Sequence, residues 1–431
     1  MKYLSLNHKA PKANFEEATV NGIAPDKGLY FPESFVPLDK LMLETIDLMT
    51  KEQIAYEVIR QFVTDSIPKE ELRKIVAETL NFDFPLIQIN ENTYTLELFH
   101  GPTMAFKDVG ARFMARCLGY FNRNKKNQKI RVLVATSGDT GGAVAHGFLG
   151  VEGVEVVILY PSGKVSTIQE KQLTTLGKNI TALKVDGTFD DCQAMVKKAF
   201  LDEELKEFNL TSANSINVAR WLPQMFYYFF AYSELKKLKK KLVFSVPSGN
   251  FGNICAGMLA KKLGLPIEFF IASTNINDTV PQFLKTGNYQ AKASSATISN
   301  AMDVGDPSNF IRIQALYNTT EDLKNDFSAL SFTDKETKKA MKDIYKQSNY
   351  IADPHGAVGY LGWQKSKDQF PDAVGVFLET AHPVKFLDTV EETLEVKIQI
   401  PKQIKEVINK EKKSVQIKNY EQLKDFLQNK K

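Results

Sequence analysis

The sequence predicts an α/β protein with open, mostly parallel twisted sheets flanked by helices, together with a mainly helical N-terminal domain. After Pro85, short runs of β-branched and apolar residues end at Gly, Ser or Pro, and each is followed by a helical pattern. This alternation is typical of parallel strands joined by crossover helices. Ligands of such sheets bind at the carboxyl ends of the strands, so the chemistry is expected in the strand-to-helix loops. The predicted strands are 131–136, 154–160, 242–246, 267–273 and 374–379.

The N-terminal 80 residues are predicted to be mainly helical. A turn-rich opening precedes apolar residues at helical spacing, Ile54, Val58 and Phe62, and a second helical pattern follows over 70–80. The C-terminal end is Lys-rich and finishes in a short amphipathic helix, with apolar residues at Leu423 and Leu427. The predicted segments are 1–80, the helical domain; 81–394, an α/β catalytic region of two subdomains with the site between them; and 395–431, the tail.

Composition narrows the class of protein. The chain of 431 residues is 43% hydrophobic and 25% charged, which suits a soluble globular protein with a large core. The formal net charge of +4 is small for this length, so neither nucleic acid nor a membrane is expected as the main partner. A small-molecule substrate is expected instead. Cys117, Cys192 and Cys255 form no CxxC pair, which argues against a metal site and for a reducing, cytoplasmic location. No signal peptide or membrane span is predicted, and a monomer or a homodimer is expected.

One lysine stands at a predicted helix start. Apolar residues at Phe106, Val109 and Phe113 follow a helical period, and a Gly-Pro-Thr turn precedes them, which places Lys107 in the first turn. Unpaired N–H groups and the positive end of the helix dipole disfavour a protonated amine there, so Lys107 is biased toward the neutral nucleophile that Schiff-base chemistry needs. The alternative is a solvated lysine without a role.

The first strand-to-helix loop has the sequence TSGDTGG over residues 136–142. It directly follows a predicted strand and opens a helix of small residues, beginning at Ala143. Hydroxyl groups and glycine N–H groups at a helix start form an anion site. The alternative is that the glycines serve only tight packing.

The second loop has the sequence PSGNFGNI over residues 247–254. Its two glycines let the backbone approach a ligand closely, and the following N–H groups can hold a phosphate without a basic side chain. The loop matches neither the dinucleotide motif GxGxxG nor the Walker motif GxxxxGK[ST], so an ATP or NAD enzyme is disfavoured.

A third cluster, SANSINVAR over residues 212–220, combines amide, hydroxyl and guanidinium groups and precedes an aromatic helix predicted over 221–232. Arg220 beside Asn and Ser is suited to grip a second phosphate. The alternative is a helix-capping motif with Arg220 on the surface.

The segment LELFHGPTMAFKD over residues 96–108 resembles the cofactor-lysine segment of threonine synthases, which are pyridoxal phosphate (PLP) enzymes of fold type II, similar to tryptophan synthase β. The resemblance covers about residues 1–395 and includes five motifs in the family's order. It implies that Lys107 forms the Schiff base with PLP and is the catalytic residue. It further implies that the cofactor is bound by Asp139, beside the ring's 3-hydroxyl, and by Thr380, at the pyridine nitrogen. The cofactor phosphate would lie in a cup formed by Gly249, Asn250, Phe251, Gly252 and Asn253. The substrate would be bound at its carboxylate by Ser137 and Thr140, and at its phosphate by Asn214, Ser215 and Arg220.

The reaction implied by this resemblance is a PLP-dependent β,γ-replacement. It converts O-phospho-L-homoserine and water to L-threonine and phosphate, the last step of threonine biosynthesis, and makes the enzyme a carbon–oxygen lyase. One alternative is a PLP-dependent serine/threonine dehydratase, which needs no second phosphate site. The other is a non-catalytic threonine-synthase-like binding protein, in which the lysine would be expected to be lost. His355 and His382 are expected to be satisfied by backbone groups at helix starts.

Overall fold

The computed structural model describes residues 1–123 and 129–429, and its chain groups into two compact units. Unit 1 combines Met1–Pro32, Lys107–Arg220 and Ile400–Lys431, and unit 2 combines Glu33–Phe106 and Trp221–Gln399. Each unit therefore unites segments that are far apart in the sequence. The predicted segments 1–80, 81–394 and 395–431 follow the linear order of the chain and stay a prediction.

Unit 1 is built on a five-stranded sheet with the order β13-β7-β6-β5-β8, in which every neighbouring pair is parallel. A small antiparallel pair, β1 and β2, lies outside this sheet. The strands of unit 1 are β1 (Tyr3–Ser5), β2 (Tyr30–Pro32), β5 (Ile130–Ala135), β6 (Val154–Pro161), β7 (Ile180–Val185), β8 (Leu210–Ser212) and β13 (Val415–Ile417). Its helices are α1 (Phe15–Asn21), α5 (Lys107–Asn122), α6 (Asp139–Gly147), α7 (Thr167–Thr174), α8 (Phe189–Leu201), η2 (Glu203–Phe208), α9 (Val218–Trp221, whose last residue belongs to unit 2), α18 (Lys402–Ile408) and α19 (Tyr420–Asn429).

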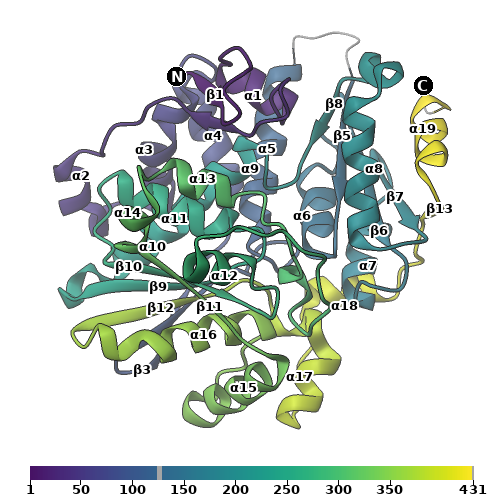
Figure 1. Cartoon of the computed structure of the whole chain (residues 1–431). Helices are drawn as coiled ribbons and strands as arrows, with labels where there is room; N and C mark the ends of the chain where they lie inside the picture. Colours follow the sequence, from purple (N-terminus) through teal and green to yellow (C-terminus); the bar gives the residue numbers. More distant parts are fainter. Residues whose placement is uncertain (124–128, 430–431) are drawn as a thin grey trace. The chain divides into compact units, whose positions relative to one another are not determined.

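The C-terminal segment completes the sheet of unit 1. Strand β13 pairs with β7, and α19 packs on α8 (Figure 1). Leu423 and Leu427 of α19 are fully buried in one hydrophobic cluster with Leu133 of β5. Arg131 also donates from Nη1 to the carbonyl of Leu427 (2.6 Å). The predicted amphipathic helix is confirmed, and its apolar face docks on the same unit that carries the Lys107 helix.

Unit 2 is built on a six-stranded sheet with the order β11-β10-β9-β12-β4-β3, parallel except for the β3–β4 pair. The strands are β3 (Leu86–Asn90), β4 (Thr93–Glu97), β9 (Lys241–Pro247), β10 (Phe269–Thr274), β11 (Phe327–Ser331) and β12 (Ala373–Glu379). Its helices are α2 (Lys40–Glu44), η1 (Ile46–Leu48), α3 (Lys51–Val63), α4 (Lys69–Thr79), η3 (Leu222–Met225), α10 (Phe226–Leu235), η4 (Lys236–Leu238), α11 (Gly252–Lys262), α12 (Thr279–Thr286), η5 (Asn300–Met302), α13 (Phe310–Ala315), α14 (Thr320–Lys324), α15 (Asp334–Ser348), α16 (Pro354–Ser366), η6 (Lys367–Gln369), η7 (Pro383–Phe386) and α17 (Leu387–Leu394).

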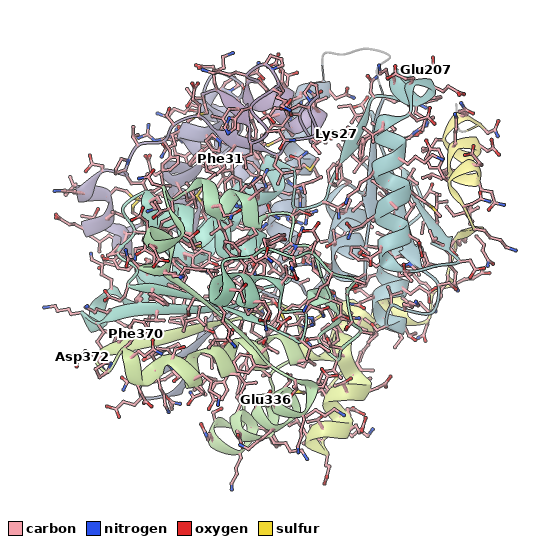
Figure 2. All side chains as sticks on the ribbon, viewed as in Figure 1. Lys27, Phe31, Glu207, Glu336, Phe370 and Asp372 are labelled. Carbon is pink, nitrogen blue, oxygen red and sulfur yellow. The ribbon has the colours of Figure 1, made fainter. Side chains whose placement is uncertain are left out.

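The core of unit 2 lies where α16 packs along β9, β10 and β12. Trp363 of α16 is buried, and its ring Nε1 donates to Thr93 Oγ1 of β4 (2.9 Å). Phe370, labelled in Figure 2, packs on Phe269 with ring centroids 5.1 Å apart. Glu336, also labelled there, closes the capping box of α15 by accepting from the Thr333 backbone N–H (2.9 Å).

The predicted α/β fold with parallel-dominated sheets is confirmed, and the five predicted strands differ from β5, β6, β9, β10 and β12 by only one or two residues at their ends. The aromatic helix predicted over 221–232 is wrong as one continuous helix. The 3₁₀ turn η3 interrupts it, because Pro223 has no N–H to donate to the preceding turn. Within residues 1–123 and 129–429, no helix combines the length and apolar character that crossing a membrane requires.

Candidate active site

Lys107 is the first residue of α5, as predicted. Both backbone groups of the preceding residue, Phe106, are held within unit 2. Its N–H donates to the carbonyl of Thr380 (2.9 Å), and its carbonyl accepts from the Tyr227 hydroxyl. Ala105 also forms an isolated antiparallel bridge with Ala381. The turn that leads into the Lys107 helix is therefore fixed to the segment that directly follows β12.

The first turns of α5 are tightly packed within unit 1. A Cβ on Gly110 would lie 2.6 Å from the carbonyl oxygen of Arg220, so this position needs a glycine. Asp108 is buried, and its charge acts on His146 of α6. Burial lowers the pKa of His146 in spite of that carboxylate, with the charges of Arg112 and Arg116 acting in the same direction as burial. The close approach of Arg220 to Gly110 places Arg220 against the helix that begins at Lys107.

The loop between β5 and α6 is closed by a threonine. Thr136 Oγ1 accepts from the backbone N–H groups of Gly138 (2.9 Å) and Gly141 (2.8 Å). Gly138 has a φ of +140°, a backbone conformation that side chains disfavour. Ser137 and Thr140, the two predicted carboxylate-binding residues, are half-buried. The loop therefore keeps its shape by internal hydrogen bonds and presents its hydroxyl groups.

Asp139 is held by a residue that the sequence did not indicate. Gln169 of α7 donates from Nε2 to Asp139 Oδ1 (2.9 Å), and both side chains are buried. A Cβ on Gly138 would lie 2.4 Å from the Gln169 side chain, so Gln169 packs directly over the loop. Gln169 lies 30 positions after Asp139, so the local sequence gives no sign of this contact. The two residues meet because strand β6 lies between them and the chain then returns through α7.

The 212–220 cluster leaves the same edge of the sheet as the 136–142 loop, because β8 pairs with β5 at Leu133–Ser212. Asn214 donates from Nδ2 to the carbonyl of Ala135 (2.9 Å), the last residue of β5. Asn214 and Ser215 are half-buried. Unit 1 therefore brings Ser137, Thr140, Asn214 and Ser215 to one edge.

Arg220 is 2% exposed, and its Nη1 donates to the carbonyl of Ala213. The alternative interpretation with Arg220 on the surface is therefore wrong. A buried guanidinium can pair with a dianion through charge-assisted hydrogen bonds. Burial of the charge is compatible with the predicted phosphate role, which stays a prediction.

The phosphate cup is predicted at the loop between β9 and α11. The backbone N–H groups of Gly249, Phe251, Gly252 and Asn253 have no hydrogen-bond acceptor among residues 1–123 and 129–429. They lie at the start of an 11-residue helix, where the helix dipole is positive. Phe251 has a φ of +59°, so the left-handed residue of the cup is a phenylalanine and not one of the glycines. These groups fit the phosphate of a cofactor.

The two asparagine side chains of the cup hold the loop in place. Asn250 Oδ1 accepts from Ser308 N–H (2.6 Å), and Asn253 Nδ2 donates to the carbonyl of Pro247 (2.8 Å). A Cβ on Gly249 would lie 2.7 Å from Met302 Cα and 2.9 Å from the Ala301 carbonyl oxygen. The two asparagine side chains are thus occupied within the protein, and η5 packs directly behind Gly249.

Thr380 follows β12, which pairs with β9 in parallel, so Thr380 and the phosphate cup leave the same edge of the unit 2 sheet. His382 Nδ1 accepts from Val384 N–H (3.0 Å), and burial lowers the pKa of His382 to about 4. His355 Nε2 accepts from Ala301 N–H (3.2 Å). Each histidine thus accepts from a backbone N–H, but His355 Nδ1 also bonds to Asp353 Oδ1 (2.5 Å), so backbone groups alone do not satisfy His355.

Three family models match the chain. "Pyridoxal-phosphate dependent enzyme" matches residues 85–380, "Threonine synthase N terminus" matches 2–80, and "Threonine synthase, C-terminal" matches 356–427. The chain is 44% identical to the threonine synthase of Escherichia coli strain K12 over 412 residues, covering 94% of each chain. It belongs to the threonine synthase family. A threonine synthase of Buchnera aphidicola from Schizaphis graminum is 46% identical over 440 residues, with 99% of each chain covered.

Solved structures of threonine synthases agree with this membership. The E. coli threonine synthase superposes with a TM-score of 0.94 at 40% identity, covering 100% of both chains. A PLP-bound threonine synthase from Brucella melitensis has a TM-score of 0.92 at 33% identity, covering 100% and 99%. The predicted family, the fold-type II architecture and the PLP-dependent enzyme class with its cofactor are confirmed. The individual site residues stay predictions.

Proposed function

We propose that the protein converts O-phospho-L-homoserine and water to L-threonine and phosphate. The observation that supports this proposal is that two groups of hydrogen-bond donors of different construction lie at the predicted anion sites. The cup at Gly249–Asn253 offers backbone N–H groups at a helix start, and the cluster at Asn214, Ser215 and Arg220 offers side-chain donors and a buried positive charge. An enzyme that binds both a phosphorylated cofactor and a phosphorylated amino acid needs both.

PLP, when bound, supplies an electron sink for the bonds at the substrate's Cα. The N–H groups of the cup would hold its phosphate, Asp139 would lie at its 3-hydroxyl, and Thr380 would face its ring nitrogen. Lys107 would carry the cofactor between turnovers. The helix start at Lys107 favours the unprotonated amine, so the same side chain can accept a proton from Cα of the substrate and return protons later.

The substrate's own groups would be held by unit 1. Ser137 and Thr140 are placed to bind the carboxylate, because their hydroxyls stand on a loop whose shape Thr136 fixes. Asn214, Ser215 and Arg220 are proposed to hold the phosphate and to keep it oriented as it leaves. Water then adds at Cβ, which completes the exchange of phosphate for hydroxide.

The two alternatives are weaker for stated reasons. A serine/threonine dehydratase has no use for a buried arginine in the 212–220 cluster, because its substrates carry no phosphate. A non-catalytic relative has no need of a lysine held at the start of α5. The proposal also includes a cytoplasmic location, a small-molecule substrate and no nucleic-acid or membrane partner. It further includes a monomeric or homodimeric state.

The proposal is tested by mixing the purified holoenzyme with phosphohomoserine and measuring the release of phosphate and threonine. Borohydride reduction followed by peptide mapping should place the pyridoxyl group on Lys107, and Lys107→Ala should lose at least about a thousandfold in kcat. Lys69→Ala is the matched control, because Lys69 also begins a helix, α4, but lies outside the proposed site. Labelling of another lysine, or keto acid from serine as the main product, would contradict the proposal.

A further inference from the structure

Two buried carboxyl groups meet in unit 2 at the start of α16. Asp353 is the N-cap of α16, Glu379 is the last residue of β12, and both are 0% exposed. Glu379 Oε1 accepts from the Asp353 backbone N–H (2.5 Å). A Cβ on Gly356 would lie 1.5 Å from Glu379 Oε2, so only a glycine leaves room for this carboxyl group.

Each carboxyl group has one oxygen that lacks a donor. Asp353 Oδ2 and Glu379 Oε2 are buried and have no hydrogen-bond partner among residues 1–123 and 129–429. The two side chains also lie within hydrogen-bonding reach of each other. Two bare carboxylates in a dry interior repel each other, and a single proton between them removes both the repulsion and the missing donor.

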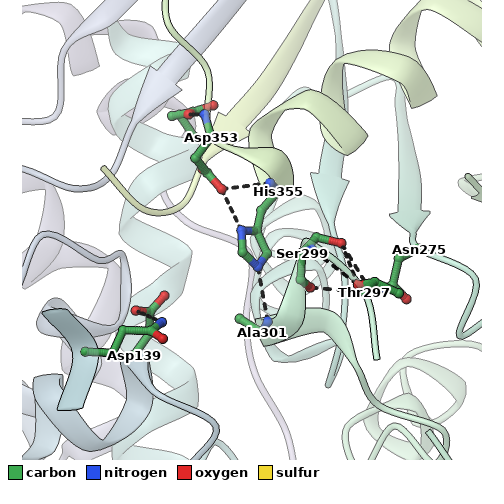
Figure 3. A network of polar contacts seen from close by, with 9 residues as sticks. Asp139, Asn275, Thr297, Ser299, Ala301, Asp353 and His355 are labelled. Atoms are coloured by element: carbon green, nitrogen blue, oxygen red, sulfur yellow. Dashed lines mark hydrogen bonds and ion pairs between the residues drawn. The ribbon is translucent and has the colours of Figure 1, made fainter. Parts of the chain in front are cut away.

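The neighbouring histidine does not neutralise this pair. Ala301 N–H donates to His355 Nε2 (3.2 Å), so Nε2 carries no proton. His355 Nδ1 lies 2.5 Å from Asp353 Oδ1 and must carry the proton of the neutral ring (Figure 3). Asp353 Oδ1 also accepts from the His355 backbone N–H (2.7 Å). With two donors on Oδ1, Asp353 is the member of the pair that holds the negative charge.

The other titratable groups around the pair are mostly acidic or neutral. Tyr350 donates to Glu97 Oε1 (2.8 Å), and Glu97 and Asp353 both act on Glu379. Burial, followed by the charge of Asp353, raises the pKa of Glu379 well above its usual value. His382 is uncharged at neutral pH because burial lowers its pKa to about 4.

Two further charges lie close by. Lys385 acts on His382 and donates to the Thr103 carbonyl (2.9 Å), and Asp303 faces His355 on the side of η5. Neither of them supplies a donor to Glu379.

The histidine connects the carboxyl pair to the phosphate cup. Ala301 lies in η5, whose backbone packs behind Gly249 at 2.7 and 2.9 Å from the position of a Cβ there. Figure 3 shows His355 reaching Ala301 from one side, while Ser299, Thr297 and Asn275 hold the preceding turn from the other. A change in the tautomer of His355 would remove the acceptor for Ala301 N–H and release one side of this support.

We propose that Asp353 and Glu379 share one proton and act as a single monoanion that fixes the tautomer of His355. In this tautomer, His355 accepts from the Ala301 N–H and positions the Ala301 turn behind the cofactor phosphate cup. Asp353, Glu379 and His355 are positioning residues, since none of them is placed on the cofactor or substrate. The inference rests on the proposed function only in taking the Gly249–Asn253 cup as the phosphate site.

Spectroscopy of the intact holoenzyme tests the protonation states directly. At pH 8, where Asp303 with a pKa of about 6 is ionised, the infrared spectrum should contain a protonated-carboxyl C=O band that disappears in Glu379→Gln. Nitrogen-15 spectra of the five histidines should show one neutral ring with the proton on Nδ1, absent from His355→Gln. A doubly protonated His355, or an unchanged carboxyl band in Glu379→Gln, would overturn the proposal.

Cofactor affinity tests the positioning role. Glu379→Gln should keep the apparent Kd for PLP within about threefold, because an amide replaces an acid that is already neutral. Asp353→Ala should weaken PLP binding about ten- to hundredfold, because the Nδ1–H of His355 then has no acceptor, its proton can move to Nε2, and the Ala301 N–H loses its acceptor. Asp39→Ala is the control, since Asp39 caps α2 by the same contact, from Leu41 N–H (2.7 Å), and its loss removes a helix cap without affecting a histidine.

The outcomes separate this inference from the proposed function. A wild-type protein that retains no PLP and releases no phosphate would contradict the proposed function. An active wild type whose Asp353→Ala variant binds PLP within threefold, or whose Glu379→Gln variant is damaged as much as Asp353→Ala, would contradict the inference alone. If Asp353→Ala does not fold, the spectra of the wild type and Glu379→Gln still decide the protonation states.

Discussion

The two glycine-rich loops of this protein look alike in sequence and differ in where their backbone N–H groups go. In the 136–142 loop of unit 1, the N–H groups of Gly138 and Gly141 end on Thr136 Oγ1, and that of Gly142 ends on the carbonyl of Gly138. In the 247–254 loop of unit 2, four successive or near-successive N–H groups have no acceptor in the described part of the chain.

The side chains follow the opposite pattern. Ser137 and Thr140 are half-buried, with hydroxyls available to a ligand, whereas Asn250 and Asn253 are used to hold the cup to Ser308 and Pro247. A loop that satisfies its own backbone can recognise a changing substrate through side chains. A loop that leaves its backbone donors open is suited to hold a group that stays, such as a cofactor phosphate.

The largest expected effect distinguishes the proposed substrate site of unit 1 from the proposed cofactor cup of unit 2. Arg220→Leu should lower kcat/KM for phosphohomoserine by about 10²- to 10⁴-fold, because charge-assisted bonds to the phosphate are lost. PLP content and spectrum should be unchanged, since the open donors of the cup lie in unit 2. Thermal unfolding controls for the lost bond to the Ala213 carbonyl. A kcat/KM within about threefold of the parent would remove Arg220 from the substrate site.

The next test exchanges one hydrogen for a methyl group in each loop. Gly249→Ala should weaken PLP binding about tenfold to a hundredfold, because the new Cβ would meet rigid backbone atoms at 2.7 and 2.9 Å. Gly142→Ala is the matched control, because its Cβ would lie 3.5 Å from the Cβ of Gln172, an ordinary van der Waals distance. Fluorescence titration of the apoenzyme with PLP measures both. Equal losses in the two variants would mean that the loops do not differ in the way proposed.

A smaller effect is expected at the acceptor that closes the substrate loop. Thr136→Val keeps the shape of the side chain but leaves the buried N–H groups of Gly138 and Gly141 without an acceptor, which should lower the free energy of unfolding by about 2–4 kcal/mol. Thr136→Ser, which retains the oxygen, should recover most of this. Chemical denaturation measures the change, and KM for substrate should rise while PLP affinity stays. Equal stability of the Val and Ser variants would show that this oxygen is unimportant.

The parts of this picture that sequence could predict are local. Strand β5 and the start of α5 at Lys107 follow from the spacing of apolar residues and from Gly and Pro turns, because both signals lie within one element. The positions of the two loops follow in turn, since a parallel sheet places such loops at one edge.

The supports of the site could not be predicted, because they depend on contacts across long stretches of chain. Gln169 reaches Asp139 over 30 residues, and Glu379 reaches Asp353 over 26. Neither contact has a periodic signal. The left-handed residue of the cup was also unexpected at Phe251, since such a conformation ordinarily favours glycine. The fold could be anticipated from pattern, but the residues that hold the site rigid could not.

The smallest expected effect concerns pH and the turn behind the cup. Burial raises the pKa of Asp303 from 3.8 to about 6, against the lowering effect of bonds from Thr297 and Asn275. The folded state thus binds a proton more tightly than the unfolded state. The stability contributed by this group is complete below about pH 4 and is lost as the pH rises through about 6. Asp303→Asn cannot titrate, so the wild type should lose about 1–3 kcal/mol relative to this variant between pH 4 and pH 7. Denaturant unfolding at several pH values measures that difference, with Asp39→Asn as a control for a solvent-exposed aspartate. A difference in the free energy of unfolding that stays constant, or that grows in favour of the wild type as the pH rises, would show that the pKa of Asp303 is not raised. The turn behind the cup would then have no pH sensitivity from this group.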